Sequence, residues 1–109
     1  MNKITRFYVG LYDEDMNKQI VNPEEVIRFC KNHFEGFTAF EASGGWMGES
    51  ENTVVIEVVD LRDSITDKAL NSMVKDSDKS AALEVKETLE IEFEQESVMT
   101  AELMGGVHF

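Results

Sequence analysis

Residues Thr53–Val59 constrain the fold more than any other part of the chain, because nearly all of them are β-branched and apolar. Branching at Cβ restricts the side-chain rotamers and favours the extended backbone of a strand. Successive side chains in a strand point to opposite faces. The even-numbered positions are all apolar, and Glu57 is the one charged residue among the odd-numbered positions. A strand that is largely apolar on both faces is expected in the middle of a sheet.

The residues before this strand predict a second strand that runs back against it. Phe37–Ala42 is expected to be extended, and Ser43-Gly44-Gly45 is expected to break it. The segment 46–51, which starts with the only tryptophan of the chain, is then expected to continue as a hairpin arm or loop.

The N-terminal third predicts a strand, a loop and a helix. Lys3–Tyr12 alternates as a half-buried strand does, and the polar segment 13–22 reads as a loop. Asn22 is a good helix N-cap, and Pro23 suits the first helical position. Gly36 is expected to end the helix in a positive-φ conformation. Spacings of three and four give this helix an apolar face, made of Val26, Phe29, Cys30 and Phe34.

The last third is helical and then extended. A short amphipathic helix is expected from Ser64 to Val74, and the polar segment 75–80 follows as a break or inserted loop. A second long helix then places Ala82, Val85, Leu89 and Phe93 on one side. Ser97–Leu103 alternates as a final strand, after which two glycines release the apolar tail 107–109.

The element order β-α-β-β-α-β predicts an α+β fold of the ferredoxin-like type, with residues 1–109 as a single domain. Right-handed crossovers put the first and third strands in the centre of a four-stranded antiparallel sheet and both helices on one face. The other face is left uncovered. It is expected to carry aromatic side chains that a partner buries, so a homo-oligomer, most simply a dimer, is predicted, and the apolar tail is expected to dock on a neighbouring copy. The candidate rings are Tyr8, Tyr12, Phe40 and Trp46.

Composition limits the location and the partners. Twenty-two acidic and ten basic residues give a formal net charge of −12, which repels nucleic acid and anionic membranes and favours cationic partners. The charge serves either solubility or mimicry of DNA. No apolar run approaches the ~20 residues of a membrane-spanning helix. One cysteine and an N-terminus without an apolar signal region indicate the cytoplasm, or the host cytoplasm if a phage encodes the protein.

Catalytic and metal motifs are not recognised in the sequence. His33 and His108 have no cysteine at metal-ligand spacing, and Cys30 lies on the predicted buried face of its helix, where a thiol behaves as a small hydrophobe. Ser43-Gly44-Gly45 is followed by no lysine and so does not match a phosphate-binding loop. We therefore expect no catalytic residue, no metal and no cofactor.

Two segments are candidates for binding or for structural roles. Trp46 follows two glycines, so its ring either stacks on a ligand or packs back on the sheet or a second subunit. Residues 94–97, Glu-Gln-Glu-Ser, close the second helix, where carboxylates oppose the helix dipole. They are expected to bond backbone amides, to pair with Arg6, or to hold a polar ligand group.

Parts of the chain resemble a family of short, functionally uncharacterised ferredoxin-like proteins of bacteria and their phages. The resemblance runs through segments 6–11, 37–46, 54–58 and 93–98, and covers most of the chain in order, whereas segment 64–80 is longer than the family pattern. The family has no established activity. Such proteins look like phage accessory proteins that interfere with host processes, which implies an oligomer that sequesters a nucleotide-derived immune signal.

On that hypothesis Tyr8 and Trp46 stack on a base, Arg6 meets phosphate, and Gln95 with Ser97 binds sugar or base edges. Ser43, Gly44 and Gly45 complete the predicted ligand-binding set. The net charge opposes an anionic ligand unless cations converge locally, for which Arg6, Arg28, Lys31 and Arg62 are the candidates.

Two other functions stay open. The acidic face of the second helix, formed by Glu84, Glu87, Glu90 and Glu94, would let the protein bind a basic host protein, as a DNA mimic or another interaction module. An enzyme acting on a small ligand is the third hypothesis, and it lacks named catalytic residues.

Overall fold

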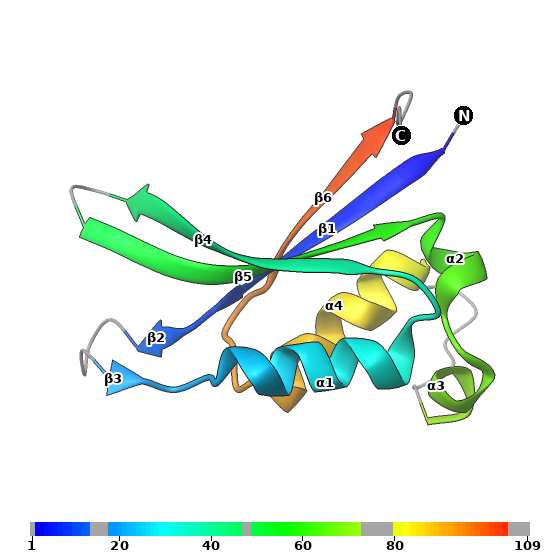
Figure 1. The fold of residues 1–109 in the computed structure, drawn as a ribbon, viewed down its shortest axis with the longest axis horizontal. Coiled ribbons are helices and arrows are strands. Elements are labelled where there is room, and N and C mark those ends of the chain that lie inside the picture. Colours follow the sequence, from blue (N-terminus) through cyan, green and yellow to red (C-terminus); the bar gives the residue numbers. More distant parts are fainter. Residues whose placement is uncertain (1, 14–17, 47–48, 73–79, 105–109) are drawn as a thin grey trace.

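The computed structural model describes residues 2–13, 18–46, 49–72 and 80–104. Their fold is mixed α+β, built on a four-stranded antiparallel sheet in the order β4-β5-β1-β6 (Figure 1). In chain order the elements are β1 (Lys3–Gly10), β2 (Tyr12–Asp13), β3 (Lys18–Gln19), α1 (Pro23–His33), β4 (Thr38–Trp46), β5 (Glu49–Val59), α2 (Leu61–Ser64), α3 (Asp67–Ser72), α4 (Ala81–Glu92) and β6 (Met99–Met104).

The centre of the sheet is formed by β1 and β5, so the expected central position of Thr53–Val59 is confirmed. Val54, Ile56 and Val58 are buried on the face toward the helices, and Val55 is buried on the opposite face. Burial on both faces is the physical reason that this strand contains so few polar residues.

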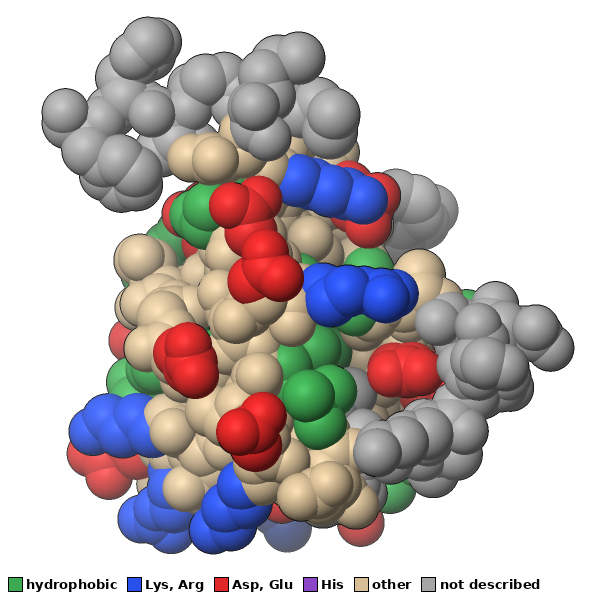
Figure 2. Space-filling model, turned by 90° about the vertical axis from the view of Figure 1, so that its right-hand side faces the viewer, with side chains coloured by type: hydrophobic (Ala, Val, Ile, Leu, Met, Phe, Trp, Pro, Cys, Tyr) green, Lys and Arg blue, Asp and Glu red, His purple; other side chains and the backbone are tan. Residues whose placement is uncertain are grey.

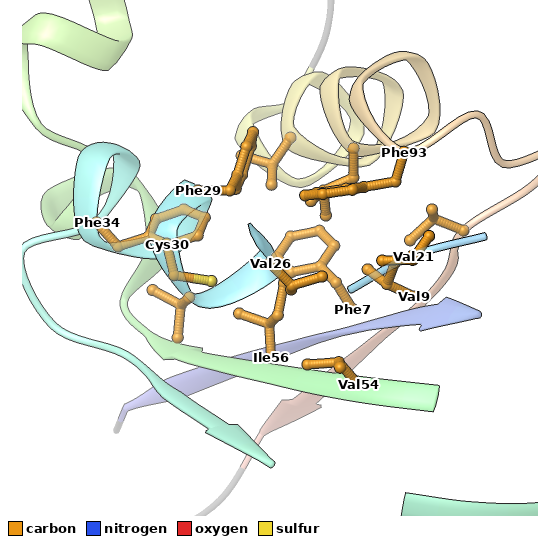
Figure 3. Packing of buried hydrophobic residues seen from close by; sticks show 14 of the residues in the cluster. Phe7, Val9, Val21, Val26, Phe29, Cys30, Phe34, Val54, Ile56 and Phe93 are labelled. Carbon is orange, nitrogen blue, oxygen red and sulfur yellow. The ribbon is translucent and has the colours of Figure 1, made fainter. Parts of the chain in front are cut away.

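One face of the sheet is covered by α1 and α4, which both lie on the same side of it (Figure 1). Phe7 of β1 is fully buried in this layer, next to Ile56 in the register of the sheet. Figure 3 shows that its ring lies near those of Phe29 and Phe93, which project from the helix layer. Phe29 and Phe93 meet edge to face, with ring centroids 5.8 Å apart. Apart from Val55, the buried apolar residues of the described segments form one cluster.

The start of α1 is as expected and its end is not. Asn22 caps the helix, because its Oδ1 accepts a hydrogen bond of 3.0 Å from the Glu24 amide. The helix already ends at His33, and Gly36 does not adopt a positive φ. The extended residue Phe34 instead forms an antiparallel bridge with Ile65. A contact with a segment 31 residues away in the sequence therefore ends the helix.

The expected break at Ser43-Gly44-Gly45 is wrong. β4 continues through these residues to Trp46, and Gly44 and Gly45 pair with Glu51 and Ser50 of β5. The strand β5 correspondingly begins at Glu49 instead of Thr53. Glycine weakens a strand but does not forbid it, and here the ladder to β5 holds the backbone extended.

The described residues contain four helical segments, one more than the two long helices and the short helix that the sequence predicts. Asp60 takes a left-handed conformation, with φ of 49°, and turns the chain directly from β5 into the short helix α2. The short helix expected from Ser64 to Val74 is present as α3, whereas Met73 and Val74 lie outside the described residues. The expected loop 13–22 contains β3, which pairs with β2 in a separate two-stranded sheet.

Candidate functional site

On the sheet face opposite the helices, we call three neighbouring rows of registered side chains the open face; a further row, Ala42, Thr53 and Gly10, continues this side of the sheet toward the β4–β5 hairpin. The alternation of β1 places Phe7 toward the helices and Tyr8 on the open face. Cross-strand pairing extends each row over three or four strands. The first row is Phe40, Val55, Tyr8 and Met99; the second is Thr38, Glu57, Arg6 and Ala101; the third is Val59, Ile4 and Leu103.

The two outer rows of the open face are apolar and partly exposed. Phe40 and Met99 stand at the two ends of the first row and are 45% and 63% exposed, while Val55 between them is buried. Leu103 in the third row is 40% exposed. Large apolar side chains grouped in this way, rather than scattered singly, mark surfaces that contact another molecule.

An ion pair occupies the middle of the open face. Arg6 Nε donates a hydrogen bond of 2.6 Å to Glu57 Oε1, between the neighbouring central strands β1 and β5. This bond raises the pKa of Arg6 above its ordinary value, and Tyr8 adds a smaller contribution. Arg6 therefore pairs with Glu57. The sequence hypothesis that Arg6 pairs with the acidic residues after α4 is wrong.

The open face is depleted of charge. The chain has a net charge of −12, yet Glu57 is the only acidic residue in the three rows, and its partner Arg6 neutralises it. Low charge and grouped apolar side chains are the combination found at the core of protein interfaces.

The residues predicted to bind a ligand do not come together in one pocket. Arg6 and Tyr8 lie in the centre of the open face. Residues 43–46 lie at the far end of the β4–β5 hairpin, where Ser43 Oγ donates a hydrogen bond of 3.2 Å to Asn52 Oδ1. Trp46 is the last residue of β4, and its side chain lies outside what the structure describes. The tail 107–109 also lies outside the described residues.

Gln95 has a structural role. Its Oε1 accepts from the Gly10 amide at 3.0 Å, and its Nε2 donates to the Gly10 carbonyl at 3.1 Å and to the Phe93 carbonyl at 3.0 Å. The side-chain amide thus makes the two hydrogen bonds to Gly10 that a residue of a neighbouring strand would make. Gly10 lies two residues beyond Tyr8, where the pairing of β1 with β6 ends. A Cβ at Gly10 would lie only 3.1 Å from Gln95 Oε1, so the glycine allows this close approach. Ser97 is exposed in the same loop.

The acidic face expected on α4 is partly used inside the domain. Glu90 Oε2 accepts from Lys86 Nζ at 2.6 Å and from the Val98 amide at 2.8 Å. These two bonds lower the pKa of Glu90. Glu90 therefore fixes the start of β6, and it is not part of a free acidic surface. The outward side of the helix also carries apolar residues, since Ile91 is 81% exposed and Leu83 is 39% exposed.

Nucleophilic and metal chemistry find no support in the described residues. Cys30 is fully buried, and its burial raises the pKa of the thiol to about 12, which keeps it protonated and unreactive. The His33 ring stacks on Phe29 at a centroid distance of 3.7 Å, and its Nδ1 bonds the Phe29 carbonyl at 2.8 Å. Three or more potential metal ligands do not gather anywhere in the described segments. None of their helices is long and apolar enough to cross a membrane.

Sequence reasoning missed a cavity of about 310 Å³ at the opposite end of the sheet from the β4–β5 hairpin. It lies between the start of β1, the turn at Asp60, and the N-terminus of α4, and Thr5 and Arg62 are among its lining residues. The sequence signal that was available is Thr5 itself, a polar residue at a position of β1 whose alternation predicts burial.

Comparison with known proteins adds no family or relative. No protein-family model, no curated protein and no solved structure matches this chain.

The contacts of Gln95 predict a measurable loss of stability on its removal. Gln95→Ala leaves the Gly10 amide and carbonyl without their partner and should lower the free energy of unfolding by about 1–3 kcal/mol. Ser97→Ala, in the same exposed loop, should change it by less than about 0.5 kcal/mol. Urea denaturation of the two variants measures both values. Equal stability of the two variants would contradict the structural role of Gln95.

Proposed function

We propose that this protein is a non-enzymatic binding protein that works as a homodimer, joined through the open faces of two sheets, and that it sequesters a small nucleotide-derived ligand. The observation that carries the proposal is the open face, an apolar, nearly charge-free surface on a strongly acidic chain. On the resemblance described above, the ligand would be a signal of host defence and the protein a phage accessory protein.

We also assign the domain to the ferredoxin-like type, with additions. The central position of β1 and β5, the antiparallel pairing of all neighbouring strands and the position of α1 and α4 on one face support this assignment. The β2–β3 hairpin and the helices α2 and α3 would be additions to the basic pattern. In this arrangement one sheet face is available to a second copy.

The second copy is favoured as the occupant by the charge pattern of the open face, whereas the size of this face limits the strength of the dimer. Under a two-fold axis, Arg6 and Glu57 make the central row self-complementary, since each copy offers one positive and one negative group. Four strands about 4.8 Å apart and about 20 Å long give roughly 400 Å² of projected area per copy. This is smaller than the ~800 Å² per partner of a standard interface, so the dimer should be reversible.

The ligand part of the proposal rests on two side chains of the open face, so the ligand would bind between the two copies of the dimer. Tyr8 offers a ring and Arg6 offers a guanidinium, two positions apart on the same side of β1. Since Arg6 is already bonded to Glu57, an anionic ligand must displace that carboxylate or share the guanidinium with it. Binding is therefore expected to depend more on stacking against Tyr8 than on charge.

The dimer is tested by its dependence on open-face residues. Phe40→Glu or Met99→Glu should convert the dimer into monomers of 12.4 kDa, because each substitution places a charge in the first row of the interface. Ile91→Glu, which changes an even more exposed apolar residue on α4, should leave the dimer intact. Sedimentation velocity measures the mass of each variant.

Salt dependence adds a second readout to this experiment. Two copies that each carry a charge of −12 repel one another, so screening should increase the dimer fraction of the wild-type protein as salt is raised. A wild-type protein that stays monomeric at every salt concentration, or an Ile91→Glu variant that dissociates like Phe40→Glu, would contradict the proposal.

The ligand is tested by thermal melting with a panel of cyclic nucleotides and ADP-ribose derivatives. A ligand that binds the folded state raises the melting temperature. The rise should disappear in Tyr8→Ala and persist in Tyr12→Ala, which removes the other tyrosine of the chain. No rise with any compound would overturn sequestration. Salt-sensitive capture of a basic protein would instead support the acidic interaction module, and turnover of a nucleotide would support an enzyme.

A further inference from the structure

The cavity beside α2 and α4 is separate from the open face and opens on the helix side of the sheet. Thr5 and Glu102, which pair across β1 and β6, line it from the sheet, and Leu61 lines it from α2. Its volume of about 310 Å³ is at the lower end of the range of ~300–1,000 Å³ that is usual for ligand cavities. A cavity of this size suits a molecule much smaller than a nucleotide.

Thr5 is a buried polar residue in the wall of this cavity. It is 1% exposed, and its hydroxyl makes no hydrogen bond to another residue in the described part of the chain. No side-chain nitrogen or oxygen of the described segments is both sealed from solvent and unpaired. Because Thr5 lines the cavity, a polar group bound there would complete the hydrogen bonding of its hydroxyl.

The N-terminus of the twelve-residue helix α4 provides donors at the same cavity. Ser80 caps the helix, with its Oγ accepting from the Leu83 amide at 3.2 Å and its carbonyl accepting from the Glu84 amide at 3.1 Å. Ala81 and Ala82, which both line the cavity, supply first-turn amides that the helical pattern leaves without a carbonyl partner. Such amides and the positive end of the helix dipole favour a carboxylate.

Among the described residues, the charged side chains of the cavity leave one positive group, Arg62, and two negative groups, Asp60 and Asp63, without an ion pair. Lys3 Nζ pairs with Glu102 at 3.0 Å, and the Lys3 amide donates to Asp60 Oδ1 at 3.2 Å. Arg62 and Asp63, neighbours on α2, line the cavity, are exposed, and form no ion pair within the described segments. Figure 2 views the side of the molecule on which α2 and α3 lie and shows acidic and basic side chains interspersed there, not separated into patches.

We infer that this cavity binds a small zwitterion of the size of a free α-amino acid. Its carboxylate binds the α4 amides and Arg62, its ammonium group binds Asp63, and the Thr5 hydroxyl bonds one of the two groups. A zwitterion has no net charge, so the overall charge of −12 does not repel it as it repels a simple anion. This inference is independent of the dimer and of the nucleotide ligand.

The experiment is a ¹⁵N–¹H titration of the full chain with glycine, L-alanine and L-serine. Acetate and methylammonium, which carry the two charged groups singly, are the matched probes. Saturable shifts of the Thr5, Ala81 and Ala82 amides are expected with the amino acids, with dissociation constants of about 1 mM or tighter. No saturable shift, or equal shifts with acetate or methylammonium alone, would overturn the inference.

Two exposed substitutions separate the roles of the charges without threatening the core. Arg62→Gln and Asp63→Asn should each weaken amino-acid binding by about tenfold, because each removes one charge-assisted contact. Arg28→Gln, an exposed change on α1, should leave it unchanged. If only Arg62→Gln weakens binding, the site holds an anion and the zwitterion assignment is wrong. An effect of Arg28→Gln as large as that of Arg62→Gln would show a non-specific charge effect and would equally overturn it.

Discussion

The apolar character of β5 on both of its faces is the constraint on which the rest of the structure depends. On one face, Val54, Ile56 and Val58 pack under α1 and α4 and close the core. On the other face the described chain supplies no second layer, and Val55 is shielded within a row of larger side chains. A sheet of this kind leaves apolar surface in water unless another molecule covers it, which is why we place a second copy there.

The positions of the strands and long helices could be predicted from local patterns, while their ends could not. Alternation identified β1, β-branched residues identified β5, and the Asn22-Pro23 pair identified the start of α1. The ends depend on contacts between distant residues: the Phe34–Ile65 bridge ends α1, and pairing with β5 carries β4 through its glycines. The left-handed turn at Asp60 was missed because an aspartate there carries no signal as strong as a glycine would.

Only some of the residues predicted to bind a ligand lie together in the structure. Gln95 does not join them, because its side chain bonds the backbone of Gly10. A polar residue between a helix and a strand is equally consistent with a ligand contact and with an internal clamp, and only the position of Gly10 distinguishes them. Arg6 and Tyr8 do share one surface, as the alternation of β1 requires. The cavity lined by Thr5 and Arg62 depends on the packing of α2 against α4, which no local pattern reports.

The negative charge of the chain repels other copies, and the neutral, apolar open face is the surface through which two copies can still associate. The most direct test is an isotope-filtered NOE experiment on a mixture of labelled and unlabelled protein, observing the methyl group of Met99, which is 63% exposed in a single chain. The account predicts intermolecular NOEs from this methyl group to residues of the open face of the partner. The account would be contradicted if the methyl group showed NOEs only within its own chain and remained exposed to solvent at the highest protein concentration.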